Sequence, residues 1–167
     1  VNDRPARLVV AVDITERKQA EETMRLQAAA LQAAANGILI TDTAGKIEWV
    51  NDAFTKLTGY RADEAIGHNP RSLVRSGQHN ESFYRDLWET ILAGHVWRGE
   101  LINKRKDGLL YTEEQTITPV RNAAGEISHF VAIKQDISAR KAAQATLRES
   151  EERYRSLFEN NHSIMLL

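Results

Sequence analysis

The residue types that carry enzyme and metal chemistry occur in this chain, but not in reactive patterns. Cysteine is absent, which excludes disulfides, thiolate metal sites and cysteine adducts. Glu113 and Glu114 are neighbours on an expected strand, so their carboxylates face opposite ways. There is no nucleophile with a base beside it and no phosphate loop, and the histidines lack metal-ligand spacing. They are His68, His79, His95, His129 and His162. We therefore expect no catalytic residue and no metal site.

Composition limits the class of protein further. The 167 residues suffice for one buried core but hardly for two, and 42% hydrophobic residues are typical of a globular chain. The net charge of −1 and the lack of a basic cluster exclude nucleic acid and anionic membranes as partners. We find no signal peptide and no apolar run near the roughly 20 residues that span a bilayer. We expect a cytoplasmic protein with no membrane contact.

Two repeats predict that the chain is a segment of a tandem array. An apolar strand, then Asp-Ile-Thr or Asp-Ile-Ser, then a charged helix occurs at 9–18 and again at 131–141. The aspartate or the hydroxyl can cap that helix by accepting its free N–H groups. A helix that leads into a short apolar strand occurs at 31–38 and again at 157–164. We expect the C-terminal strand of one domain at 1–15, a linker helix at 16–35, a complete domain at 36–138, a linker helix at 139–160 and the start of another domain at 161–167.

Between the two linker helices the pattern is α+β. Apolar residues of the longest expected helix, such as Phe83, Leu87 and Ile91, recur at helical spacing. Asp107-Gly108 supplies the positive φ of a tight hairpin between two long strands. The expected strands are 37–41, 46–50, 96–104, 109–120 and 127–135, and the expected helices are 53–57, 61–66 and 80–93. Antiparallel hairpins around short helices form a five-stranded sheet with helices on one face, which creates a pocket.

The middle unit resembles a PAS domain from about Leu31 to Ser138. Matching pieces follow in the family's order: 42–47, 50–54, 57–60, 66–67, 105–108, 118–120, 125–127 and 136–138. Residues 151–160 are similar to the entry of a following PAS unit. PAS domains sense signals or dimerise, so the resemblance implies the PAS fold and a non-catalytic sensory module. It also implies adjacent PAS domains and an output domain, such as a kinase or a cyclase, as partners in the full-length protein.

One stretch is similar to the flavin-binding branch of this family: Gly67–Arg71, Leu87-Trp88, Trp97–Glu100 and Asn103–Gly108. Light-oxygen-voltage (LOV) photoreceptors have a reactive cysteine where this chain has Pro70, so the resemblance implies no light-driven adduct. The pattern is closer to the FAD-binding PAS domains of bacterial redox sensors such as NifL and MmoS, although the NifL type has a glutamate at Pro70. The resemblance therefore implies FAD as the cofactor. The implied cofactor-binding residues are Asn69, Arg71, Trp88, Trp97, Asn103, Glu113 and Lys134.

Some of these residues have a chemistry that suits the task. The Asn103 amide can both donate to and accept from the pyrimidine edge of a flavin. Arg71 can pair with phosphate oxygens. Glu113 and Lys134 stand where LOV domains have Asn and Gln, so the flavin edge must meet different partners here.

Each implied residue also has an ordinary structural explanation. Trp88 fits a helix core and Trp97 fits sheet packing. Asn103 can satisfy backbone groups beside a hairpin, and Arg71, Glu113 and Lys134 can point to solvent. A haem would need His79 or His95 turned into the pocket. The alternatives to a FAD redox sensor are a cofactor-free PAS that only dimerises and relays and, less favoured, a haem-binding gas sensor.

The linker helices carry apolar seams. Residues spaced by four and three form the first seam, at Met24, Ala28, Leu31 and Ala35, and the second, at Leu147, Tyr154 and Phe158, with Glu151 as a polar break. Such spacing suits a parallel coiled coil. We expect a homodimer joined through these helices, and the alternative is that each helix packs on its own sheet.

Overall fold

The structure, a computed structural model, describes residues 14–162 and the side chains of residues 14–158. Most of the expected strand of a preceding domain (1–15) and most of the expected start of a following domain (161–167) lie outside the described residues, and residues 161 and 162 belong to the last helix. The elements are α1 (Thr15–Ala33), β1 (Gly37–Asp42), β2 (Ile47–Val50), α2 (Asp52–Thr58), α3 (Ala62–Ala65), α4 (Pro70–Val74), α5 (Glu81–Leu92), β3 (Trp97–Lys104), β4 (Leu110–Arg121), β5 (Ile127–Asp136) and α6 (Ser138–His162).

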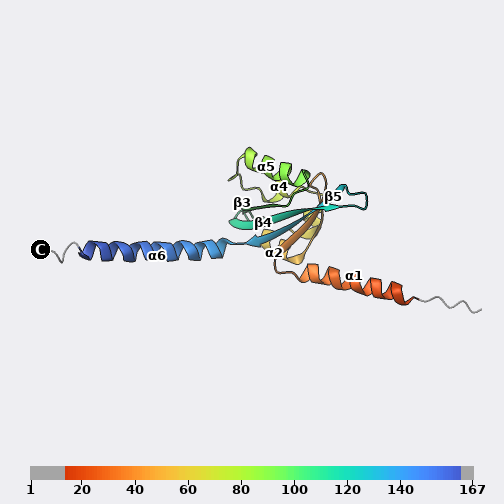
Figure 1. Ribbon diagram of the computed structural model, residues 1–167, viewed down its shortest axis with the longest axis horizontal. Coiled ribbons are helices and arrows are strands. Elements are labelled where there is room, and N and C mark those ends of the chain that lie inside the picture. Colours follow the sequence, from red (N-terminus) through yellow and green to blue (C-terminus); the bar gives the residue numbers. More distant parts are fainter. Residues whose placement is uncertain (1–13, 163–167) are drawn as a thin grey trace, which may run out of the picture.

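The strands form one antiparallel sheet of five strands in the order β2-β1-β5-β4-β3 (Figure 1). The predicted sheet is therefore confirmed. The turn between β3 and β4 contains Gly108 at a φ of 90°, and its N–H donates to the Arg105 carbonyl. That left-handed conformation costs glycine nothing, because it has no Cβ.

The helices cover one face of the sheet, as the sequence predicted. Alternate strand residues point to the same face, so the buried residues of β3, β4 and β5 lie two or four positions apart along each strand. The apolar residues among them, Tyr111 excepted, share one hydrophobic core with Phe54 of α2 and with Leu87 and Ile91 of α5. The inner face of the sheet and the helices over it therefore enclose the interior of the domain.

Helix α4 was not among the expected elements. Its first residue is Pro70, and the Asn69 side chain accepts a hydrogen bond from the Arg71 N–H as the N-cap. Proline suits the first helical position because the N–H that it lacks would have no helical partner there. The five residues of α4 have too few apolar positions to show a helical period.

The two terminal helices extend away from the sheet on different sides (Figure 1). None of the residues of α1 is buried, although Met24 and Leu31 are apolar. Leu147, Tyr154 and Phe158 of α6 are also exposed. Neither helix packs its seam on its own sheet. Among the described residues, no helix combines the length and hydropathy needed to cross a bilayer.

Candidate functional site

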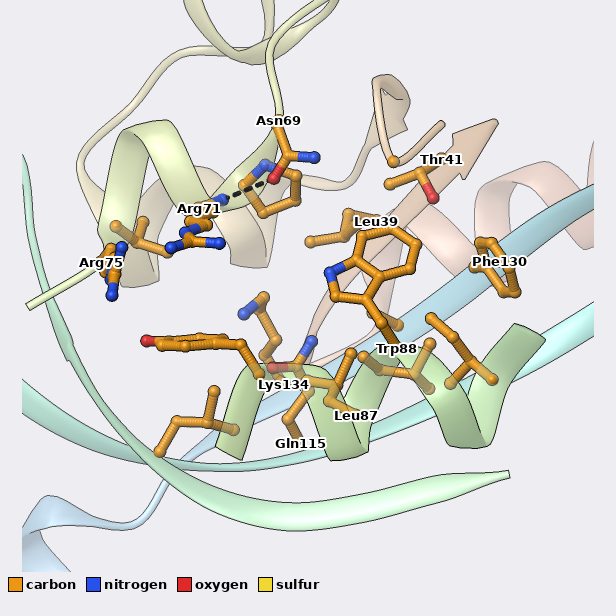
Figure 2. A pocket seen from close by; sticks show the side chains of 18 of the residues that line it. Leu39, Thr41, Asn69, Arg71, Arg75, Leu87, Trp88, Gln115, Phe130 and Lys134 are labelled. Carbon is orange, nitrogen blue, oxygen red and sulfur yellow. Dashed lines mark hydrogen bonds between the residues drawn. The ribbon is translucent and has the colours of Figure 1, made fainter. Parts of the chain in front are cut away.

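A cavity lies between the inner face of the sheet and helices α4 and α5 (Figure 2). Its volume is about 100 Å³. A single water needs only about 10–15 Å³, so the cavity is several times larger than a single-water site. Most of its wall is apolar, formed by Leu39, Val74, Leu87, Ile91, Leu101, Ile117, Phe130 and Ala132.

The polar floor of this cavity consists of Asn103 on β3, Gln115 on β4 and Lys134 on β5. The antiparallel register places Gln115 directly opposite Lys134. All three residues are buried. No hydrogen bond with another described residue engages the Gln115 amide, so both its donor and its acceptor remain for a ligand. The floor can therefore form hydrogen bonds with a ligand, and two hydroxyl-bearing residues, Thr41 and Tyr84, also line the cavity.

A buried ion pair supports this floor. Lys134 Nζ lies 2.5 Å from Glu113 Oε1, and the two side chains are 2% and 0% exposed. The same carboxylate oxygen accepts a hydrogen bond of 2.9 Å from Asn103 Nδ2. The possibility that Glu113 and Lys134 point to solvent is therefore wrong, because both lie on the alternating inner face of the sheet. Asn103 likewise bonds a side chain with its amide rather than a backbone group.

Two buried oxygen atoms beside the ion pair lack a regular hydrogen bond: Glu113 Oε2 and the Tyr111 hydroxyl. Burial raises the pKa of Tyr111 above its usual range, and the negative charge of Glu113 raises it further. Tyr111 therefore stays neutral at ordinary pH. Unpaired polar atoms in a native interior are uncommon and mark places where a partner is missing.

The mouth of the cavity carries two arginines that share one carboxylate. Arg71 donates to both oxygens of Glu81 at 2.9 Å, and Arg75 donates to Oε1 at 2.6 Å. The hydrogen bond from Arg75 lowers the pKa of the Glu81 carboxyl most, and the hydrogen bonds from Arg71 lower it further. Both guanidinium groups also lie over the ring of Tyr84, at 5.3 and 5.0 Å from its centre. Arg71 is therefore a partly exposed residue with a fixed place at the mouth.

Trp88 points from α5 into the cavity (Figure 2). Its ring meets Phe130 edge to face, with the centres 6.0 Å apart. A Cβ at Gly45 would come within 2.8 Å of the indole and 2.7 Å of the Asn69 amide, and Gly45 has a φ of 78°. The turn between β1 and β2 therefore needs glycine, both for its conformation and for the close approach of Trp88.

Of the residues implied by the resemblance, the structure gathers Asn69, Arg71, Trp88, Asn103 and Lys134 around the cavity. Glu113 stands behind Lys134 and does not line it. Trp97 lies outside the lining as well, and its ring packs edge to face on Phe83, as the sheet-packing explanation expected. No described histidine lines the cavity, and the His79 ring accepts a hydrogen bond from the Ile102 N–H.

Sequence reasoning missed Arg75, Tyr84 and Gln115. Gln115 stands two residues from Glu113 on an alternating strand, and that period was a usable signal for a second polar residue on the same face. Arg75 could be placed only with α4, whose start is indicated by Asn69-Pro70.

The cavity floor is connected to the start of α6. Asp136 ends β5, accepts from the Ser138 N–H at 2.9 Å and pairs with Arg105 at 2.8 Å. The Ser138 hydroxyl accepts from the Thr112 N–H on β4 rather than capping α6. The predicted cap is therefore provided by the aspartate. In the first copy of the repeat, Asp13 lies outside the described residues.

A family model for the PAS fold matches residues 26–137. The chain belongs to the PAS family. The resemblance found in the motifs is thereby confirmed, and the fold places this PAS module among sensory domains of signal-transducing proteins.

Curated relatives carry this PAS sequence in several contexts. The chain is 39% identical over 118 residues to a nitrogen fixation regulatory protein of Klebsiella oxytoca, covering 71% of the chain and 24% of the relative. It is 33% identical to a bacterioopsin transcriptional activator of Halobacterium salinarum, with 87% and 22% covered. A blue-light-activated histidine kinase of Brucella canis is 37% identical, with 55% and 19% covered. The chain thus spans about a quarter or less of the length of these relatives.

Solved structures share the PAS fold. An RNA-binding light-oxygen-voltage receptor superposes with a TM-score of 0.68 at 24% identity, covering 91% of this chain and 41% of the receptor. A PAS domain from Colwellia psychrerythraea gives a TM-score of 0.62 at 24% identity, covering 70% and 98%. At this level of identity the likeness concerns the fold alone.

Proposed function

We propose that this PAS module binds FAD and acts as a redox sensor that passes its state through α6 to a downstream output domain. The observation that carries the proposal is a largely apolar cavity whose polar floor consists of two amides and an ammonium. A flavin ring has the same asymmetry, since one edge carries carbonyl and N–H groups and the opposite edge is a dimethylbenzene. The identities of 39% and 38% with two nitrogen fixation regulatory proteins support the same assignment.

The residues present fit such a ring. Glu113 holds the NH₂ group of Asn103, so the Asn103 carbonyl is the part of that amide left to accept from a ligand N–H. Lys134 can donate to a ligand carbonyl, and Gln115 can do either. Together they match an edge in which an N–H stands between two carbonyls. Arg71 and Arg75 lie at the mouth, where the phosphates of a dinucleotide would emerge.

When bound, a flavin supplies redox chemistry in which reduction turns its N5 from a hydrogen-bond acceptor into a donor. Side chains on β4 and β5 would then exchange hydrogen-bond partners, and each bond left unpaired is worth on the order of 1–3 kcal/mol. Lys134 also lines a second hollow together with Ala35, Arg105 and Asp136. This hollow lies near the C-terminal end of α1 and the N-terminal end of α6. A shift of Lys134 can therefore reach the Arg105–Asp136 pair and the first turn of α6.

Flavin content tests the proposal. Trp88→Ala and Asn103→Ala should each lower the flavin retained by protein purified from a flavin-rich expression host, measured by visible absorbance after denaturation. Trp49→Ala is the matched control, because Trp49 is absent from the cavity lining and its loss should leave flavin content unchanged. If the unaltered protein retains no flavin and takes up none on reconstitution, the cofactor-free alternative, a PAS module that only dimerises and relays, is correct.

We also propose that two copies associate through α1 and α6. The described part of the chain buries neither apolar seam. An isolated helix of 19 residues is marginal in water, and a parallel partner helix would stabilise both. The helices would then connect the sensor with neighbouring PAS and output domains.

A further inference from the structure

The Lys134–Glu113 ion pair is more costly than the fold requires. Taking two charges out of water costs several kcal/mol per ion, and well-packed apolar pairs are often no less stable. Both residues are almost completely buried, and one carboxylate oxygen has no regular hydrogen bond. Buried charges with perturbing neighbours beside a cavity are typical of functional sites.

The pair is not symmetric with respect to the cavity. Lys134 lines the cavity and Glu113 does not. A ligand on the polar floor therefore meets the ammonium directly, while the carboxylate acts from behind by holding Lys134 Nζ and Asn103 Nδ2 on a single oxygen. Glu113 is in this sense a positioning residue, and Lys134 is the contact residue.

The orientation of a flavin ring follows from the cavity wall. Its dimethylbenzene edge has no hydrogen-bonding group and suits the apolar wall, whereas its pyrimidine edge would be left unsatisfied there. The pyrimidine edge therefore belongs on the floor, against Lys134. Two-electron reduction places negative charge on this edge, at N1 and the adjacent carbonyl.

We propose that Lys134, positioned by Glu113, makes this pocket bind the reduced, anionic flavin ring more tightly than the oxidised, neutral ring. The inference rests on the proposed function and adds to it the direction in which the protein shifts the reduction potential. In the step concerned, two electrons from an external reduced electron carrier and one proton from solvent convert the neutral ring into its N5-protonated anion. Lys134 donates no proton in this step and acts through the charge of its side chain.

The mouth arginines have a weaker influence on the same ring. Arg71 and Arg75 are partly exposed and share the countercharge of Glu81. Solvent screens such charges far more than it screens a buried ammonium. The Tyr111 hydroxyl, whose pKa is raised by burial, stays neutral beside Glu113 and adds no charge.

The test is the midpoint potential of flavin bound to the protein, followed by absorbance during titration with dithionite and a reference dye. The informative variant is E113Q/K134Q, because removing one partner alone would leave an unpaired buried charge. Gln at both positions keeps an acceptor for Asn103 and a donor toward the cavity while removing both charges. We expect the preference for reduced over oxidised flavin to fall at least tenfold, which is about 30 mV to lower potential for a two-electron couple.

The matched control is E64Q/K106Q, which removes an exposed ion pair outside the cavity lining and should leave the potential unchanged. The unaltered protein provides a second measurement that does not depend on how the variant folds. Its bound flavin should have a higher potential than free flavin under the same conditions. A bound flavin with an equal or lower potential, or an unchanged potential in folded E113Q/K134Q, overturns the inference and leaves the proposed function standing. A protein that binds no flavin overturns both.

Discussion

Replacement of Asn51 should show how much of the domain's stability comes from the cap of α2 and how much from the bonds that Asn51 makes to residues distant in sequence. Asn51 is 1% exposed and makes four side-chain hydrogen bonds. Its Oδ1 accepts from the N–H groups of Ile38 and Phe54 at 2.8 and 3.0 Å. Its Nδ2 donates to the carbonyls of Leu31 and Asn36 at 3.1 and 3.0 Å. One side chain thus joins β1, the start of α2 and the end of α1.

The expected cost of Asn51→Ala follows from these bonds. Loss of the α2 cap costs about 1 kcal/mol, and leaving the buried Ile38 N–H unpaired costs about 1–3 kcal/mol. The carbonyls of Leu31 and Asn36 are partly buried and can turn to water, so they add little. We expect the free energy of unfolding to fall by about 2–4 kcal/mol, which lowers the melting temperature by roughly 10 °C.

Asn51→Ser is the matched variant, because its hydroxyl oxygen still accepts at the α2 cap while the two bonds donated by the amide are lost. It should cost less than Asn51→Ala and should selectively increase hydrogen exchange in α1. Urea denaturation gives the free energies, and amide exchange at Ile38 reports the cap side of the network. A loss below about 1 kcal/mol for Asn51→Ala, or equal losses for the two variants, would refute the reasoning.

Three other predictions concern pH, the output helix and association. The pKa of Tyr111 is raised in the folded state, so just above pH ~10 its hydroxyl ionises only in the unfolded state. The free energy of unfolding should therefore be unaffected by Tyr111 below pH ~10 and should fall by about 1.4 kcal/mol per pH unit above it. Tyr111→Phe should flatten this fall in urea titrations, and an unchanged slope would contradict the assignment. Asp136→Ala removes the α6 cap and the partner of Arg105, so hydrogen exchange of the backbone amides at 138–141 should become faster. Asp136→Asn should retain much of the protection, and equal exchange in the two variants would show that the cap is unimportant. Met24→Glu combined with Leu31→Glu should shift the protein from dimer to monomer in light scattering, because unpaired charge in an apolar seam is costly; an unaltered protein that is monomeric at high micromolar concentration contradicts the dimer.

Local features of the chain were sufficient for most secondary structure. The alternation in β3, β4 and β5 and the helical spacing of Phe83, Leu87 and Ile91 depend only on residues close in sequence, and the observed elements match them within about two residues. Helix α4 was not predicted, because its five residues are too few to show the 3.6-residue hydrophobic period of a helix. The cap that Asn51 provides for α2 is local in sequence, but its bonds toward α1 and β1 involve residues 13 to 20 positions away.

The sequence by itself determined the strands, the turns, the family and most of the polar residues that gather at the cavity, because those features depend on residue type and local order. The tertiary structure decided which of those residues meet. Glu113 and Lys134 are 21 residues apart, and they pair only because the β4–β5 register sets Gln115 opposite Lys134 and leaves Glu113 as its diagonal neighbour. A shift of that register by one residue would turn Lys134 to the other face of the sheet. The buried charge at the floor of the cavity is therefore a property of strand pairing, which local sequence does not specify.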